Sequence, residues 1–173
     1  MAAMADPGPT GPDLSTSLAA AEFPAPVFTA SGCAAAGREL APFFDLTEIG
    51  GVVTKSIMMS PRSGRPTPRM AETPSGMLNS IGLQGPGIES FIANDLAWLR
   101  DRDVRVIVSI AGGTAEEFGQ LATRLRHEPG IDAIEVNISC PNVASRGLVF
   151  ACDPAAAGGA VRAVRRNTNS TVP

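Results

Sequence analysis

The sequence has little of several residue types that mark other classes of protein. It contains no Tyr, one Trp and three cysteines, Cys33, Cys140 and Cys152. Three cysteines are a small and odd number, so we expect the reduced thiols of a cytoplasmic protein. No group of His, Cys and Asp has metal-ligand spacing, so we expect no bound metal. No run of 18 apolar residues is present, which argues against a membrane-spanning helix. The net charge of -3 forms no basic patch, which argues against nucleic acid as a partner.

What is present is the composition of a single globular domain. Hydrophobic residues make up 44% and charged residues 18% of 173 residues, enough to bury a core. Residues 1–12 are rich in Ala, Gly and Pro and lack the features of a signal peptide. We therefore predict a disordered tail over residues 1–12 and one domain over residues 13–173.

The chain alternates between apolar runs and amphipathic segments. The apolar runs are rich in Val and Ile, which is typical of buried strands in a parallel sheet, and they are Pro26–Ala30, Gly51–Ser56, Val104–Ile110 and Ala133–Ile138. Three helices are predicted by apolar stripes and by capping residues. They run from Ile88 to Leu99, from the Thr114 cap to Pro129–Gly130, and from Asp153–Pro154 to about Arg166.

This alternation predicts either an open, doubly wound sheet or a closed (β/α) barrel. Each predicted strand ends in a polar or glycine-rich stretch, and a barrel builds its site from the carboxyl ends of several strands. The first turn has no dinucleotide fingerprint. We favour the barrel, with an open flavodoxin-like topology as the alternative.

Residues 58–87 form a long segment rich in Pro and Gly and with little periodicity. Such segments in compact domains are usually functional loops, although a disordered insertion is the other interpretation. The stretch from Met77 to Leu83 is too apolar to be expected in water.

A few side chains near the predicted strand ends have the chemistry of a site. Cys140, held before Pro141, is a candidate nucleophile or general base, or else a small buried hydrophobe. Lys55 ends an apolar strand and is expected either to reach into the barrel mouth or to extend into solvent. Asn79 and Asn137 each offer a donor and an acceptor, which suits a heterocycle with amide edges, but Asn is also common in turns.

Several motifs of this chain resemble those of class 1 dihydroorotate dehydrogenases. The similarity runs from Asp13 to Pro173, and the stretch from Thr67 to Gln84 is most like the NAD-linked, two-subunit type. The matching motifs are Asp13 to Ser15 (DLS), Pro26 to Gly32 (PVFTASG), Val53 to Ser56 (VTKS), Pro66 to Arg69 (PTPR), Glu72 to Gln84 (ETPSGMLNSIGLQ) and Asn137 to Val143 (NISCPNV).

The resemblance implies a TIM barrel that holds FMN at its mouth, and it implies a role for particular residues. Cys140 matches the catalytic base. The positions that match orotate-binding residues are Lys55, Asn79, Ser80, Ile81, Gly82, Leu83 and Asn137. The positions that match FMN-binding residues are Ala30, Ser31, Lys55, Ser56 and Asn137. Ser109 stands where the subtype usually has a flavin-contacting Asn, and its shorter side chain is expected to reach the flavin through water or not at all.

The implied reaction is oxidation of dihydroorotate to orotate with hydride transfer to FMN, in pyrimidine biosynthesis. The implied partners are a second copy of the chain and an electron-transfer subunit with FAD and an iron–sulfur cluster. Alternatives are a related FMN-dependent dihydropyrimidine dehydrogenase, which reduces uracil or thymine, and a non-catalytic half-barrel. Because a complete barrel takes about 250 residues, the similarity covers about its first four β-α units. We expect these 173 residues alone to be inactive and to associate through unpaired sheet edges.

Overall fold

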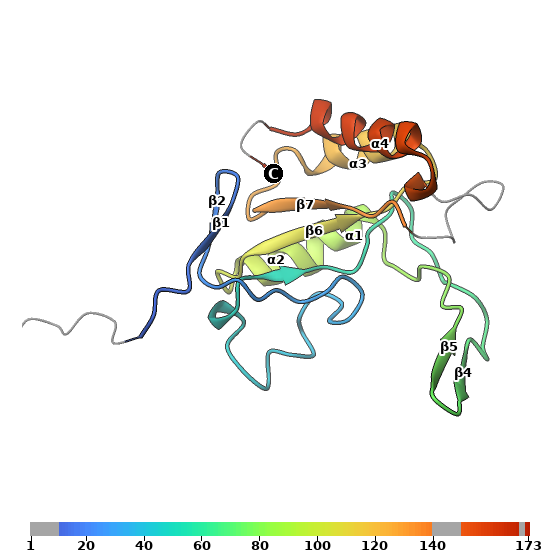
Figure 1. Ribbon diagram of the computed structural model, residues 1–173, viewed down its shortest axis with the longest axis horizontal. Coiled ribbons are helices and arrows are strands. Elements are labelled where there is room, and N and C mark those ends of the chain that lie inside the picture. Colours follow the sequence, from blue (N-terminus) through green and yellow to red (C-terminus); the bar gives the residue numbers. More distant parts are fainter. Residues whose placement is uncertain (1–10, 140–149, 170–171) are drawn as a thin grey trace, which may run out of the picture.

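The structure contains a three-stranded parallel sheet that runs through the middle of the molecule (Figure 1). It is a computed structural model that describes residues 11–139, 150–169 and 172–173. The strands are β3 (Val52–Val53), β6 (Val106–Ile110) and β7 (Ala133–Val136), in the order β3-β6-β7. The predicted parallel sheet is therefore confirmed for three of its four strands.

The fourth predicted strand, Pro26–Ala30, is reduced to a single bridge. Phe28 pairs in parallel with Gly51 at the outer edge of β3, and the Thr29 amide donates to the Gly51 carbonyl at 3.2 Å. No regular strand is assigned there. Pro26 has no backbone N–H, which limits how far this segment can pair with its neighbour.

A bulge interrupts the pairing of β3 with β6. Val53 pairs with Ile107, whereas Ile57 pairs with Ile110. The chain therefore uses four steps on the β3 side and three on the β6 side, so one extra residue lies within Thr54–Ser56. Such bulges bend a strand and redirect its side chains, often beside functional sites.

The three predicted helical regions are all present. The first comprises α1 (Ile88–Ser90), the π-helical segment η2 (Phe91–Leu96) and α2 (Ala97–Arg100); the others are α3 (Ala115–Leu125) and α4 (Pro154–Asn167). Short 3-10 turns are η1 (Leu46–Glu48) and η4 (Phe150–Cys152). The caps act as predicted, because the Thr114 side chain accepts from the Glu117 amide and the Asp153 side chain accepts from the Ala155 amide.

The π-helical segment was not predicted. The Asn94 side-chain amide donates to the Ser90 carbonyl at 2.9 Å. An α-helix would use that carbonyl for the Asn94 backbone N–H. A side chain that occupies a backbone acceptor in this way favours a local change of helix type.

The core lies between the sheet and the helices, and α3 and α4 lie side by side over β7 (Figure 1). It is built from apolar residues of the strands and of the inward faces of the helices, including Val106, Val108, Ile110, Phe91, Leu99, Phe118, Leu121, Ala160 and Val164. Burying each large side chain contributes about 1.5–3 kcal/mol. This packing fixes the strands whose carboxyl ends carry the polar groups described below.

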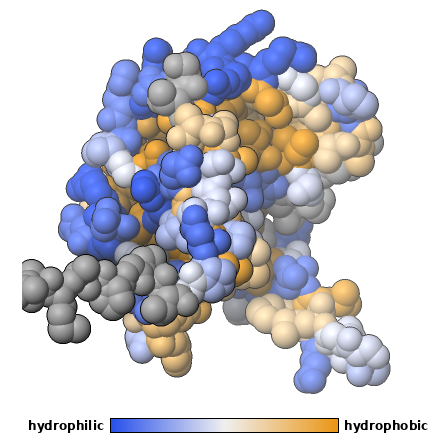
Figure 2. Space-filling model, turned by 60° about the vertical axis from the view of Figure 1, so that its left-hand side comes forward, coloured by the Kyte–Doolittle hydropathy of each residue, from blue (hydrophilic) through white to orange (hydrophobic). Residues whose placement is uncertain are grey.

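Two antiparallel hairpins lie outside the sheet. They are β1 (Thr16–Leu18) with β2 (Ala21–Phe23), and β4 (Met70–Thr73) with β5 (Gly76–Asn79). The second hairpin projects away from the rest of the molecule (Figures 1 and 2). Met77 and Leu78 are 60% and 67% exposed, so the expectation that the stretch from Met77 to Leu83 stays out of water is wrong for these two residues. Ile81 and Leu83 are half-buried. The hairpin pairs its backbone groups within itself, which leaves the Met77 and Leu78 side chains without a face to pack on.

Among the residues that the structure describes, no helix combines the length and the apolar character needed to cross a membrane.

Candidate functional site

Three polar side chains meet at the carboxyl ends of the sheet strands. The Ser56 and Ser109 hydroxyl oxygens are 2.9 Å apart, and the Asn137 side-chain amide donates to the Ser56 hydroxyl at 2.8 Å. Ser109 belongs to β6, Asn137 directly follows β7, and Ser56 lies in the bulge after β3. In parallel α/β folds, sites are built at this end of the strands.

The bulge explains why neighbouring residues after β3 serve the same site. In a regular strand, Lys55 and Ser56 would point to opposite faces, but here both line one cavity. Lys55 leaves the ladder, and its amide donates to the Ala35 carbonyl at 2.9 Å. The Ser109 amide instead donates to the Thr54 hydroxyl at 3.2 Å. Thr54 thus replaces a backbone acceptor with a side-chain oxygen.

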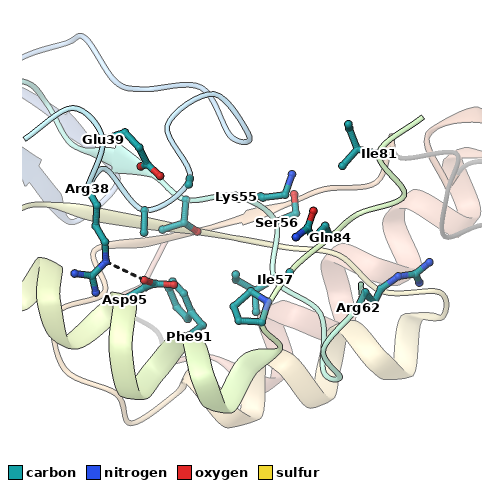
Figure 3. Close-up of a pocket in the computed structure, with 15 residues that line it drawn as sticks. Arg38, Glu39, Lys55, Ser56, Ile57, Arg62, Ile81, Gln84, Phe91 and Asp95 are labelled. Atoms are coloured by element: carbon teal, nitrogen blue, oxygen red, sulfur yellow. Dashed lines mark hydrogen bonds and ion pairs between the residues drawn. The ribbon is translucent and has the colours of Figure 1, made fainter. Parts of the chain in front are cut away.

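The cavity next to Lys55 and Ser56 has a volume of about 580 Å³. Ile57, Phe91 and Ala36 give it an apolar wall. Figure 3 shows Lys55 and Ser56 on the side toward Ile81, with the helix that carries Phe91 opposite. Lys55 is half-buried, and in the described part of the chain no carboxylate forms an ion pair with its ammonium group. The cavity therefore offers an ammonium group outside the described ion pairs beside an apolar surface, and the Glu39 carboxylate lines the same cavity.

An ion pair closes the other end of this cavity. The Arg38 guanidinium lies 3.3 Å from the Asp95 carboxylate, as the dashed line in Figure 3 marks. The same guanidinium donates to the Asn94 carbonyl at 2.8 Å and lies over the Trp98 ring, 4.7 Å from its centroid. Arg38 thereby ties the loop that contains Ala35 to the helix segment η2.

The loop before Arg38 carries Ala30 and Ser31, two positions predicted to bind the cofactor. Ala30 is exposed and Ser31 is half-buried, and a turn follows in which the Cys33 amide donates to the Ala30 carbonyl. Ala35 has φ 45°, an uncommon conformation for a residue with a Cβ. This conformation directs the Ala35 carbonyl toward the Lys55 amide.

The predicted substrate segment Asn79–Leu83 is only partly brought to the cavity. Ile81 lines it together with Lys55. Asn79 and Ser80 are exposed at the end of the hairpin. Gly82 and Leu83 follow Ile81 with φ 81° and 52°, respectively. The segment therefore reaches the cavity at Ile81, and its polar side chains lie farther out.

Cys140, the predicted catalytic base, lies outside the described residues. It directly follows Ser139, whose backbone amide donates to the Asn137 side-chain oxygen at 3.2 Å. Cys33 and Cys152 are exposed thiols that form no disulfide with each other. Within residues 11–139, 150–169 and 172–173, no group of three or more His, Cys, Asp or Glu could hold a metal ion.

An ion-pair network fixes the helix that follows the predicted substrate segment. Arg124 on α3 pairs with Glu89 on α1 at 2.7 Å and also with Glu128. Hydrogen bonds from Arg124 lower the pKa of Glu89 below its ordinary value. Hydrogen bonds to Glu89 and then to Glu128 raise the pKa of Arg124. The ion pair between Arg124 and Glu89 thereby links α3 to α1.

Sequence reasoning missed Thr54 and the buried position of Ser109. Thr54 is 1% exposed and Ser109 is fully buried. Polar residues inside an apolar strand are buried only where they are hydrogen-bonded. The polar Thr54 at the end of the apolar run was therefore a signal for a buried hydrogen bond. The bulge that makes use of it was not predictable from the pattern.

The polar groups in this site suit an electron-rich heterocycle. The ammonium group of Lys55 and the hydroxyl of Ser56 lie beside an apolar wall, and the Asn137 carboxamide is bonded to Ser56. A few polar groups on an apolar surface are typical of a small-molecule site. These donor groups fit the carbonyl and ring-nitrogen acceptors of a flavin such as FMN.

Comparison with known proteins gives the family. The model of the dihydroorotate dehydrogenase family matches residues 13–172. The chain belongs to the dihydroorotate dehydrogenase family. Its similarity to solved structures agrees. The crystal structure of DHODH in complex with ferulenol from Eimeria tenella superimposes with a TM-score of 0.71 at 20% identity. That match covers 94% of this chain and 46% of the other, and it shows a shared fold.

Curated relatives are more similar in sequence. The chain is 48% identical over 158 residues to a protein of Geotalea daltonii and 51% identical over 157 residues to one of Pelobacter propionicus. Both are named dihydroorotate dehydrogenase B (NAD(+)), catalytic subunit. Each match covers 91% of this chain and 52% of the relative. The chain therefore spans about half the length of the curated relatives that it matches.

Proposed function

We propose that the full-length protein oxidises dihydroorotate to orotate and passes the hydride to bound FMN, in pyrimidine biosynthesis. Family membership supports the reaction class. The observation that carries the proposal is the cluster of Ser56, Ser109 and Asn137 beside Lys55. Hydrogen-bonding groups and a positive charge at one edge of the sheet support the binding of a flavin and an anionic substrate there.

The resemblance to the family implies a role for each part of the site. Cys140 takes the proton from C5 of dihydroorotate as general base, while the hydride from C6 goes to FMN. Lys55, Asn137 and the segment Asn79–Leu83 hold the substrate. Lys55 has no carboxylate partner among the described ion pairs, so its charge is available to an anion.

The same proposal includes the cofactor-binding residues and the architecture. Ala30, Ser31, Lys55, Ser56 and Asn137 hold FMN, and the domain over residues 13–173 is part of a TIM barrel with about four β-α units. The parallel order of the strands and the helices that cover them support this arrangement. The polar groups at the strand ends then form one side of the barrel mouth.

The relatives' names suggest partners. A protein called a catalytic subunit works with another subunit, and the NAD(+) in the same name suggests that electrons leave for NAD(+). We propose an electron-transfer subunit with FAD and an iron–sulfur cluster, a homodimer of the catalytic subunit, and a cytoplasmic location.

Anaerobic stopped-flow spectroscopy of the full-length protein tests the reaction. Dihydroorotate is expected to bleach the flavin absorbance and to yield orotate, whereas dihydrouracil is expected to leave the flavin oxidised. Bleaching by dihydrouracil and not by dihydroorotate would favour the related dihydropyrimidine enzymes. A colourless protein that takes up no FMN would refute the proposal.

Variants of two cysteines test the role of the base. Cys140→Ser is expected to slow bleaching at neutral pH by about 10²–10⁴-fold, because serine is a far weaker base. Cys152→Ala is the matched control, since Cys152 is exposed in η4, and it should bleach at the parent rate. Near-normal rates for Cys140→Ser would contradict the assignment.

A further inference from the structure

Ser109 is buried too deeply to be a surface group of the site. Its exposed fraction is 0%, although it stands at a position predicted to contact the flavin. Its hydroxyl has one hydrogen-bond partner in the described structure, the Ser56 hydroxyl at 2.9 Å. Its backbone is held as well, because the Ser109 amide donates to Thr54 and the Ser109 carbonyl accepts from Ile57.

The direction of the bond between the two serines follows from burial. A buried hydroxyl whose proton has no acceptor costs about 1–3 kcal/mol. The Ser56 oxygen is the acceptor within reach of the Ser109 proton, so Ser109 donates and Ser56 accepts. The opposite direction would leave the Ser109 proton without an acceptor among the described residues, whereas Ser56 lines the cavity and its own proton can reach a ligand or water there.

The orientation of the Asn137 carboxamide follows from its other neighbour. The Ser139 backbone N–H lies 3.2 Å from one end of the carboxamide. A backbone N–H only donates, so that end is the oxygen. The nitrogen therefore faces Ser56, to which it donates at 2.8 Å.

These two results determine which groups remain for a ligand. The Ser56 oxygen accepts from both Ser109 and Asn137, which uses both of its lone pairs. Its own proton is then free to point into the cavity that Ser56 lines. The second N–H of Asn137 and the Lys55 ammonium group are donors as well. The remaining groups of this cluster are all donors.

We propose that Ser109 is a positioning residue that does not touch the ligand and that acts through Ser56. By donating to Ser56, it turns the Ser56 hydroxyl into a donor and, with Asn137, makes this edge of the site donor-only. Such an edge takes a ligand edge made of acceptors, namely carbonyl oxygens and unprotonated ring nitrogens. The identity of that ligand as FMN rests on the proposed function.

A double-mutant cycle in the full-length protein tests the inference. FMN dissociation constants are measured by flavin fluorescence for the parent, Ser56→Ala, Ser109→Ala and the double variant, with Ser17→Ala on β1 as a matched control. Ser56→Ala is expected to weaken FMN by about 3–10-fold, the equivalent of one neutral hydrogen bond. Ser109→Ala is expected to weaken FMN binding measurably but by less than Ser56→Ala does. The double variant is expected to have the same FMN dissociation constant as Ser56→Ala, because Ser109 acts through Ser56.

The reduction potential of the bound flavin is the second readout. A donor beside the flavin stabilises the electron-rich reduced form, so Ser56→Ala and Ser109→Ala both lower the potential, and the double variant again equals Ser56→Ala. A purely structural Ser109 would lower stability and leave the potential unchanged, which would overturn the inference.

Other outcomes are also decisive. Losses of FMN affinity that multiply in the double variant would show that Ser109 contacts the ligand directly and would overturn the inference. Ser109→Ala with parent affinity would do the same. If the parent binds no FMN, the proposed function fails. The inference is then decided by the free energies of unfolding in urea of the same four proteins. Non-additive losses then support the bond from Ser109 to Ser56, and additive losses exclude it.

Discussion

Replacing Thr54 by Val tests how the bulge after β3 holds the site together. The two side chains have nearly the same shape, so the change removes an acceptor and leaves the packing in place. In the structure the Thr54 hydroxyl accepts from the Ser109 amide at 3.2 Å, and the two residues are 1% and 0% exposed. The Ser109 carbonyl accepts from the Ile57 amide on the β3 side of the strand. The Ser109 N–H faces the same side, toward the bulge, and has no other strand to bond to.

The expected cost is that of one unpaired buried N–H. We expect Thr54→Val to lower the free energy of unfolding by about 1–3 kcal/mol, measured by urea denaturation of the full-length protein at a fixed FMN concentration. The Ser109 amide should also exchange its hydrogen faster. Thr73→Val on β4 is the matched control, and as a substitution outside the core it should stay within about 0.5 kcal/mol of the parent. A Thr54→Val variant as stable as the parent would refute this account of the bulge.

The remaining predictions concern the substrate segment, the ion-pair network and one glycine. Asn79→Ala should weaken the binding of orotate by about 0.5–1.5 kcal/mol, the net contribution of one neutral hydrogen bond, with little effect on FMN. A titration of the flavin absorbance with orotate that shows equal affinity would place Asn79 outside the site. Glu89→Gln should lower the free energy of unfolding, and the difference from the parent should be complete above the ordinary pKa of 4.5 and should vanish as pH falls through the lowered pKa of Glu89. A difference that does not change between pH 7 and pH 3 in unfolding experiments would contradict the pairing with Arg124. Gly37→Ala should lower the melting temperature, because Gly37 has φ 84° and a Cβ would lie 3.1 Å from Leu46, and an unchanged melting temperature would argue against this backbone conformation.

The helices and the central strands were predictable because their signals are local. The apolar stripe of α3 and its Thr114 cap depend on residues within one or two turns of each other. The strands β6 and β7 are apolar except for Ser109 and Glu135, which suits a sheet that is covered by helices. The carboxyl ends of parallel strands lie at the same edge of a sheet. The grouping of Asn137 with the residues after β3 followed from this rule.

The features that escaped prediction depend on contacts between distant segments. The bulge exists because Ser109 bonds to the Thr54 side chain and Ala35 accepts from Lys55, and no local pattern encodes these pairs. The π-helical segment depends on the Asn94 side chain, which reads as an ordinary polar position in the sequence. The hairpin of β4 and β5 leaves apolar residues in water, contrary to the tendency on which the prediction relied.

A crystal structure of the full-length protein with FMN and orotate tests the central claim most directly. The claim is that Lys55, Ser56 and Asn137, at the carboxyl ends of neighbouring strands, form a donor edge for the ligands. We predict that each of these side chains has a donor within about 2.7–3.2 Å of a flavin or orotate acceptor, and that the Ser109 hydroxyl contacts Ser56 only. Ligands bound away from this edge, or an acceptor group of the cluster facing a ligand donor, would contradict the claim.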